Sequence, residues 1–122
     1  GFFLMYEEAH IDKHSHKNDM AKTFEAVLRF NQAIARFMEF AFYNPDTFVL
    51  ITADHGGYGR GHGSDTDEEK WVFVAIKGKT VNKGGAIDRM QVKDFPAITL
   101  RALGLPANPN WMSHVPEGIF AE

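Results

Sequence analysis

The feature that most constrains the fold is an uninterrupted run of β-branched, aliphatic and aromatic residues at positions 47–52, Thr-Phe-Val-Leu-Ile-Thr. A strand covered on one face alternates apolar and polar side chains. This run does not alternate, which is typical of a parallel strand buried on both faces. Asn44, Pro45 and Asp46 precede it, and a glycine-rich loop follows at residues 56–63. The run therefore predicts an α/β fold with a parallel sheet.

A second apolar run, at residues 2–6, predicts another strand near the start of the chain. Between the two runs, Asn18 or Asp19 can cap a long helix that continues to about Tyr43. Its apolar residues recur at three- and four-residue spacing and form two rows, which suits a helix packed on a sheet. The rows are Met20, Phe24, Val27, Ile34, Met38 and Ala41, and Phe30, Ala33, Phe37 and Phe40. The strand–helix–strand order predicts a right-handed crossover.

The rest of the chain predicts a third strand over residues 71–76 and one more helix. This helix begins with Asp94 as its cap, carries Pro96 in its first turn and ends at Gly104. From residue 107 onward the chain is rich in proline and asparagine, which predicts a loop.

Composition narrows the class of protein. A chain of 122 residues holds one domain. Its 13 basic and 16 acidic residues leave a net charge of −3, which argues against a nucleic-acid partner. No apolar run approaches the length of a membrane span, and the absence of cysteine excludes disulfides and thiolate zinc sites. Because the chain starts inside an apolar run without Met, we expect it to be a piece of a larger chain.

Carboxylate and imidazole side chains follow both strands that we expect to be neighbours. They are Glu7, Asp12 and His16 after the first strand, Asp54 and His55 after the second, and His62 in the glycine-rich loop. The carboxyl ends of parallel strands carry the functional loops of α/β sheets. Mixed carboxylate and imidazole ligands, three to a site, are typical of catalytic zinc. Asp12 and His16 can meet through one helical turn, whereas the adjacent Asp54 and His55 converge only where the strand ends.

Each of these signals also has a simpler interpretation. A single histidine is more often a surface residue than a ligand, and we interpret His10, His14 and His114 in this way, although His10 could orient a ligand. The phenylalanine rows of the long helix indicate core packing, and residues 68–70, Glu-Glu-Lys, indicate a solvated turn. The combination of ligand types at two neighbouring strand ends is what favours a metal site.

Three motifs together resemble the carboxyl-terminal half of the alkaline phosphatase superfamily. They are the apolar run 2–6 with Glu7, Asp12 and His16, then Val-Leu-Ile-Thr-Ala-Asp-His-Gly at 49–56, and Gly-His-Gly at 61–63. The resemblance spans nearly the whole chain. It implies the parallel-sheet sandwich of that superfamily, with residues 1–122 as the carboxyl-terminal part of a single alkaline-phosphatase-like domain.

The resemblance also implies a set of metal ligands. Asp12, His16 and His62 would bind a first zinc ion, and Asp54 and His55 a second. Glu7 matches the glutamate that holds magnesium in alkaline phosphatases, and Glu8 fits the spacing less well. The implied activity is hydrolysis of phosphate esters, by a phosphatase or a phosphodiesterase, at a two-zinc site.

The resemblance places the nucleophile outside this sequence. The family's serine or threonine nucleophile, and an aspartate that shares the second zinc, belong to an amino-terminal strand and helix. The hydroxyl residues present are in the wrong context to replace it; they are Ser15, Thr52, Ser64, Thr66 and Ser113. We therefore expect the 122-residue chain alone to be inactive.

Several alternatives remain open. The short loop from His55 to His62 resembles the phosphodiesterase and phosphoethanolamine-transferase branches, while Glu7 resembles the true alkaline phosphatases. The other hypotheses are a phosphotransferase or phosphomutase, a sulfatase, or a non-catalytic metal-binding remnant. Sulfatases typically use one calcium ion. Expected partners are a phosphate-ester substrate and either the missing amino-terminal half or a second copy of the chain. Family resemblance suggests a periplasmic or secreted location.

Overall fold

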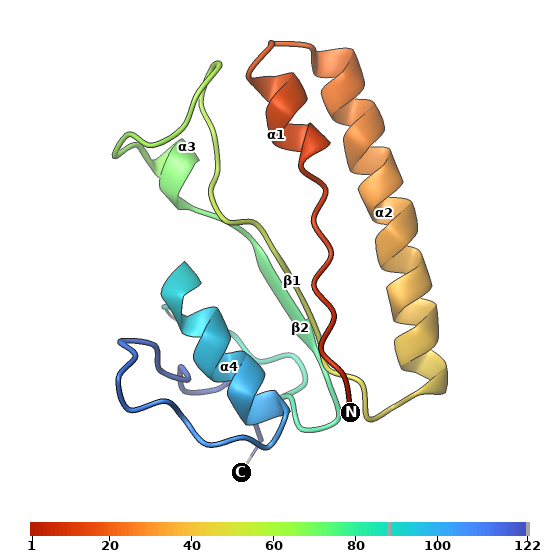
Figure 1. Cartoon of the computed structure of the whole chain (residues 1–122), viewed down its shortest axis with the longest axis vertical. Helices are drawn as coiled ribbons and strands as arrows, with labels where there is room; N and C mark the ends of the chain where they lie inside the picture. The colour runs from red at the N-terminus through yellow and green to blue at the C-terminus, as the bar shows by residue number, and fades with distance from the viewer. Residues whose placement is uncertain (88, 122) are drawn as a thin grey trace.

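Two helices packed against each other form the amino-terminal part of the molecule, in a computed structural model that describes residues 1–87 and 89–121 (Figure 1). The short helix α1 (His10–Ser15) lies along the first turns of α2 (Met20–Tyr43). The Asp19 side chain caps α2 by accepting the N–H of Lys22 at 3.1 Å. The predicted long helix is therefore confirmed, including its cap. No helix among the described residues is long and apolar enough to cross a membrane.

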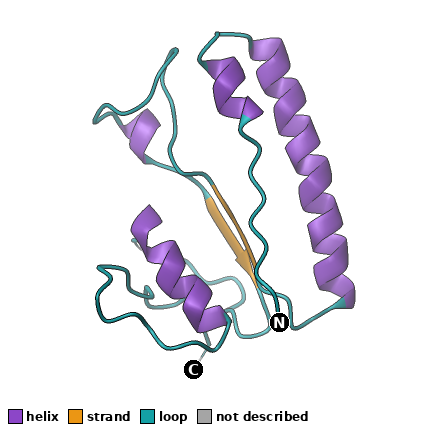
Figure 2. Ribbon diagram, in the orientation of Figure 1, coloured by secondary structure: helices purple, strands orange, loops and turns teal. Residues whose placement is uncertain are grey.

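Among the described residues the sheet has two strands, and it differs from the prediction (Figure 2). Strand β1 (Val49–Thr52) pairs with β2 (Val74–Lys77) in antiparallel register, with Val49 opposite Lys77. The predicted parallel pairing is wrong for these two strands, because β1 pairs with the next strand of the chain, which returns in the opposite direction. The strands are half-exposed, so the predicted burial on both faces is also wrong. The chain does combine helices with strands, as an α/β fold requires.

Residues 2–6 were expected to form a strand, and the structure does not assign them to one. They run as an extended segment along α2 (Figure 1) and contact it through aromatic pairs, Phe2 with Phe40 and Tyr6 with Phe30, each at 6.1 Å between ring centroids. Within residues 1–87 and 89–121, no backbone hydrogen bond joins this segment to a neighbouring strand. A strand requires such a ladder, so the predicted crossover does not form here.

The link between β1 and β2 carries a short helix, α3 (Asp67–Lys70), and the glycine-rich loop. Both lie beyond the end of the strands, on the side where α1 ends (Figure 1). Within the loop, Tyr58 and Gly61 exchange backbone hydrogen bonds at 3.1 and 3.2 Å, and Gly59 has a φ of +61°. This tight turn needs glycine and brings the segment back toward α1.

The carboxyl-terminal part contains a 3₁₀ helix, η1 (Val92–Asp94), that leads into α4 (Phe95–Ala102). The helix predicted there is confirmed, and Gly104, with a φ of +70°, ends it as expected. Asp94 differs in detail from the prediction. Its carboxylate accepts the N–H of Gln91 at 2.9 Å and does not cap α4.

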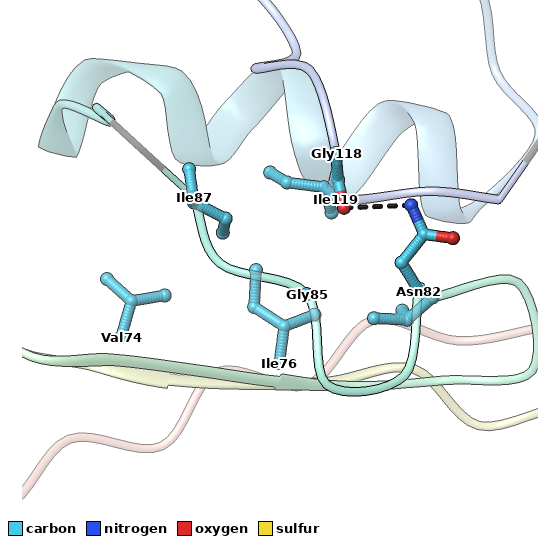
Figure 3. A pocket seen from close by; sticks show the side chains of 8 residues that line it. Val74, Ile76, Asn82, Gly85, Ile87, Gly118 and Ile119 are labelled. Atoms are coloured by element: carbon cyan, nitrogen blue, oxygen red, sulfur yellow. Dashed lines mark hydrogen bonds between the residues drawn. The ribbon is translucent and has the colours of Figure 1, made fainter.

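The last residues fold back onto the loop that follows β2. Asn82 donates its backbone N–H to the Ile119 carbonyl at 2.9 Å, and its side chain donates to the carbonyl of Gly118 at 3.0 Å (Figure 3). Between this segment and β2 lies a cavity of about 100 Å³, lined by apolar side chains that include Val74 and Ile76. Ile119 is buried at its edge, so this end of the molecule has a small core of its own.

Candidate metal centre

Helix α1 brings Asp12 and His16 to the same side of one helical turn. His16 follows the last residue of α1, and its backbone N–H donates to the Asp12 carbonyl at 3.0 Å, which continues the turn. Residues four apart on a helix are neighbours. The His16 Nε2 atom accordingly lies 3.2 Å from Asp12 Oδ1.

The glycine-rich loop adds His62 to this pair. His62 Nε2 lies 3.6 Å from Asp12 Oδ1, and one potential ligand atom from each of Asp12, His16 and His62 lies within 4.8 Å of the other two. The His16 ring is also tied to the loop, because its Nδ1 atom lies 2.7 Å from the carbonyl oxygen of Arg60. The structure therefore brings together the three residues predicted for the first zinc.

The hydrogen bonds of the rings determine which nitrogen carries the proton. A carbonyl oxygen can only accept, so Nδ1 of His16 donates to Arg60. The other ring nitrogen, Nε2, faces the Asp12 carboxylate, which is an acceptor. A ring nitrogen and a carboxylate oxygen this close need a proton or a cation between them. A donor set of carboxylate and Nε2 atoms with second hydrogen bonds to carbonyls fits a divalent metal.

Asp54 and His55 adjoin this group through ring stacking. The His55 ring lies 3.6 Å from the His62 ring between centroids, with 21° between their planes. Its Nδ1 atom donates to the Gly56 carbonyl at 2.7 Å, and Nε2 lies 3.5 Å from Oδ2 of Asp54. The Asp54 side chain is 84% exposed. Of the two residues predicted for a second zinc, His55 thus lies next to the first group, and the exposed Asp54 carboxylate lies next to His55.

The two neighbouring glutamates at the start of α1 differ in their surroundings. Glu7 is exposed, whereas the Glu8 side chain is only 9% exposed. Glu8 accepts hydrogen bonds from the backbone N–H of His10 at 3.0 Å and from its ring at 2.8 Å, and Arg29 lies 3.9 Å away. Burial raises the pKa of Glu8, but these bonds and the Arg29 charge outweigh it, so its pKa is lowered. Magnesium binding by Glu7 stays a prediction.

The three histidines interpreted as surface residues lie outside the Asp12 group in the structure. His10 pairs with Glu8, His14 stacks on His10 at 5.9 Å between centroids, and His114 pairs with Asp94 at 3.1 Å. Sequence analysis missed Glu69, because the solvated turn expected at residues 68–70 is helix α3 with Glu69 buried inside it. Four helical residues are too few for periodicity to reveal which one faces inward.

With this geometry in place, similarity to known proteins identifies the family. A sequence model of the alkaline phosphatase family matches residues 1–90. The chain belongs to the alkaline phosphatase family. The resemblance inferred from the three motifs is therefore confirmed. No solved structure is significantly similar to the chain.

Individual members of the alkaline phosphatase family match about half of the chain. It is 41% identical over 56 residues to streptomycin-6-phosphate phosphatase of Streptomyces griseus, which covers 46% of the chain and 12% of that protein. It is 43% identical over 60 residues to alkaline phosphatase 4 of Bacillus subtilis, covering 48% and 13%. It is 43% identical over 56 residues to the repressible alkaline phosphatase of Saccharomyces cerevisiae, covering 45% and 10%. The matched region thus spans a small part of each relative.

Proposed function

We propose that this chain supplies the metal ligands of a site that hydrolyses phosphate esters. The observation that carries the proposal is the convergence of Asp12, His16 and His62, whose ligand atoms lie within 4.8 Å of one another. The family and its phosphatase-named relatives support the reaction type. The substrate named for one relative is a phosphate ester, and we propose the same broad class for the protein that carries this sequence.

The ligand assignment is part of this proposal. The first zinc would be held by Asp12, His16 and His62, the second by Asp54 and His55, and a magnesium ion by Glu7. When bound, the ions would activate an attacking hydroxyl and neutralise charge on the phosphoryl group. The chain's own contribution is to hold the Nε2 atoms of His16 and His55 as lone-pair donors, because carbonyl oxygens fix their Nδ1 protons.

We also propose that the nucleophile lies outside these 122 residues. Ser15 and Thr52 use their hydroxyls inside the fold, since Ser15 donates to the Ile11 carbonyl at 2.8 Å and Thr52 to the Phe73 carbonyl at 3.0 Å. Ser113 accepts the N–H of Ala97 at 3.0 Å. An attacking hydroxyl must instead be free and near the metal ligands.

The remaining part of the proposal concerns residues 2–6. We propose that this extended, exposed segment pairs with a strand from the rest of the protein or from a second copy, as part of a larger parallel sheet. Its apolar side chains favour such pairing, as do its backbone groups, which have no strand partner within residues 1–87 and 89–121.

Zinc titration by calorimetry tests the ligand assignment. Asp12→Asn should lower zinc affinity by roughly tenfold or more, because an amide is a much weaker ligand than a carboxylate. Asp46→Asn is the matched control, since Asp46 is an exposed carboxylate that pairs only with Lys79 among the described residues. Equal zinc affinity in the two variants would contradict the proposal.

The activity of the protein that carries this sequence tests the reaction. His62→Ala should lower kcat for a phosphate ester by orders of magnitude, whereas the 122-residue chain alone should show no turnover. Turnover of an aryl phosphate by the isolated chain, abolished by His62→Ala, would contradict the proposed position of the nucleophile.

A further inference from the structure

Glu69 stands apart from the acidic residues around it. Asp67, Glu68 and Lys70 are exposed, but Glu69 is 9% exposed, although all four belong to the same short helix α3. A buried carboxylate is costly unless hydrogen bonds satisfy it. The bonds that Glu69 makes lead to the two ends of the glycine-rich loop, directly after His55 and shortly after His62.

The first connection is through the backbone of α3. The N–H of Gly56 donates to the Glu69 carbonyl at 2.8 Å, and the N–H of Gly57 donates to the Glu68 carbonyl at 2.9 Å. Gly56 directly follows His55, so these bonds fix the position at which the glycine-rich loop leaves that histidine. A side chain at Gly56 would overlap the Glu68 carbonyl oxygen, so only glycine permits this close approach.

The second connection is through the Glu69 carboxylate. Its Oε2 atom accepts the backbone N–H of Ser64, two residues after His62. The hydroxyl of Ser64 also holds the pKa of Glu69 below its usual value, although burial acts to raise this pKa. The backbone N–H groups of Ser64 and Gly63 and the charge of His62 lower the pKa further. The carboxylate therefore stays charged and binds the end of the glycine-rich loop, at Ser64, through a charge-assisted hydrogen bond.

We propose that Glu69 is a positioning residue that ties the start of the glycine-rich loop, next to His55, to its end, next to His62. Its carbonyl holds the start of the loop and its carboxylate holds the end, so a single residue sets the spacing of two histidine rings that stack at 3.6 Å. The consequence for metal binding rests on the proposed function, whereas the consequence for the rings does not. Glu69 itself makes no contact with the Asp12 group in this proposal.

The experiment compares Glu69→Ala and Glu69→Gln with the control Glu68→Ala. Glu68 is the adjacent exposed residue, and it contacts the loop through its carbonyl, which the substitution keeps. NMR of the metal-free chain reports the ring signals of His55 and His62, and calorimetry reports zinc affinity. Glu69→Ala should shift both rings and lower zinc affinity roughly 10- to 100-fold, the effect typical of losing a residue that orients ligands.

Glu69→Gln distinguishes positioning from general stability. The amide keeps an oxygen that can accept the Ser64 N–H, but the bond is weaker without the charge, so both effects should be intermediate. If Glu69→Ala unfolds the chain, ring shifts confined to His55 and His62 in Glu69→Gln support the proposal. Ring signals in Glu69→Gln that match those of Glu68→Ala would overturn it.

The two readouts keep this inference separate from the proposed function. A chain that binds no zinc would contradict the metal assignment, yet the ring signals of the metal-free variants would still test the role of Glu69. Altered zinc affinity with unshifted rings would overturn the positioning role and leave the ligand assignment standing.

Discussion

The two ends of the molecule differ in how fully their side chains are buried. At the carboxyl-terminal end, Ile98 and Ile119 are fully buried and the Asp94 carboxylate is 1% exposed. At the amino-terminal end, the side chains of residues 2–5 are 63–77% exposed, although all four are large and apolar. The last residues pack on the loop after β2 and on Phe48, whereas the aromatic residues of the 2–6 segment contact the aromatic side chains of α2.

The long helix belongs to the incomplete end. Ala26 and Ala41 are its buried residues, while Met20 and Phe24 are more than 60% exposed. The apolar face of α2, whose two rows predicted packing on a sheet, is therefore only partly covered among the described residues. An exposed apolar surface of this kind is typical of an interface.

The largest loss of unfolding free energy should come from a substitution at the carboxyl-terminal end. Ile98→Ala removes a fully buried side chain of α4 and leaves a cavity, which costs about 2–5 kcal/mol of unfolding free energy. Phe3→Ala in the exposed segment should cost less than about 0.5 kcal/mol in dilute solution. Urea denaturation of the two variants and the parent chain gives both values.

The dependence of stability on protein concentration tests whether a second copy covers residues 2–6. If residues 2–6 are covered by a second copy, the cost of Phe3→Ala should grow with protein concentration, and the cost of Ile98→Ala should not. Sedimentation at low micromolar concentration should show species larger than the monomer for the parent chain. A compact, stable monomer with no partner would contradict the proposal that this surface is covered.

The buried carboxylate of the carboxyl-terminal end should have the next largest effect. Asp94 accepts the N–H of Gln91 at 2.9 Å and that of His114 at 3.3 Å, and its Oδ1 atom lies 3.1 Å from the His114 ring. Asp94→Ala leaves these donors without an acceptor and should cost about 1–3 kcal/mol. Asp46→Ala, which breaks an exposed ion pair with Lys79, should cost at most about 1 kcal/mol. Equal costs in thermal unfolding would show that burial of Asp94 contributes nothing.

What the sequence could predict follows the same division. The ends of α2 and α4 were predictable because their signals are local: Asp19 caps the first, and Gly104 ends the second. The direction of β2 and the pairing of residues 2–6 were not, because a strand's partner depends on distant residues or on other parts of the protein. The apolar pattern identifies β1 as a strand but says nothing about which neighbour it takes.

The candidate site divides in the same way. The four-residue spacing of Asp12 and His16 already indicated one helical turn, and the glycines around His62 indicated a tight loop. The role of Glu69 depends on which face of a four-residue helix turns inward, and no pattern in Asp-Glu-Glu-Lys reveals this. The sequence could therefore predict the candidate ligands from local spacing, but it could not predict the tertiary contacts of Glu69 that we propose position them.

The smallest effect on stability should come from Asp19, the cap at the start of α2. The backbone N–H of Lys22 donates to the Asp19 carboxylate at 3.1 Å and lowers its pKa; burial opposes the shift, and the Lys22 charge, 3.4 Å away, adds to it. Because the folded pKa lies below the ordinary value of 3.8, the charge stabilises the fold above that value. This stabilisation is lost as the pH falls from about 3.8 through the lower folded pKa. Asp19→Asn keeps an oxygen that can cap α2 but has no charge. Its melting temperature should therefore lie slightly below that of the parent at neutral pH and converge with it in acid. A difference that stays constant down to acid pH would show that the charge of Asp19 does not contribute to the stability of α2.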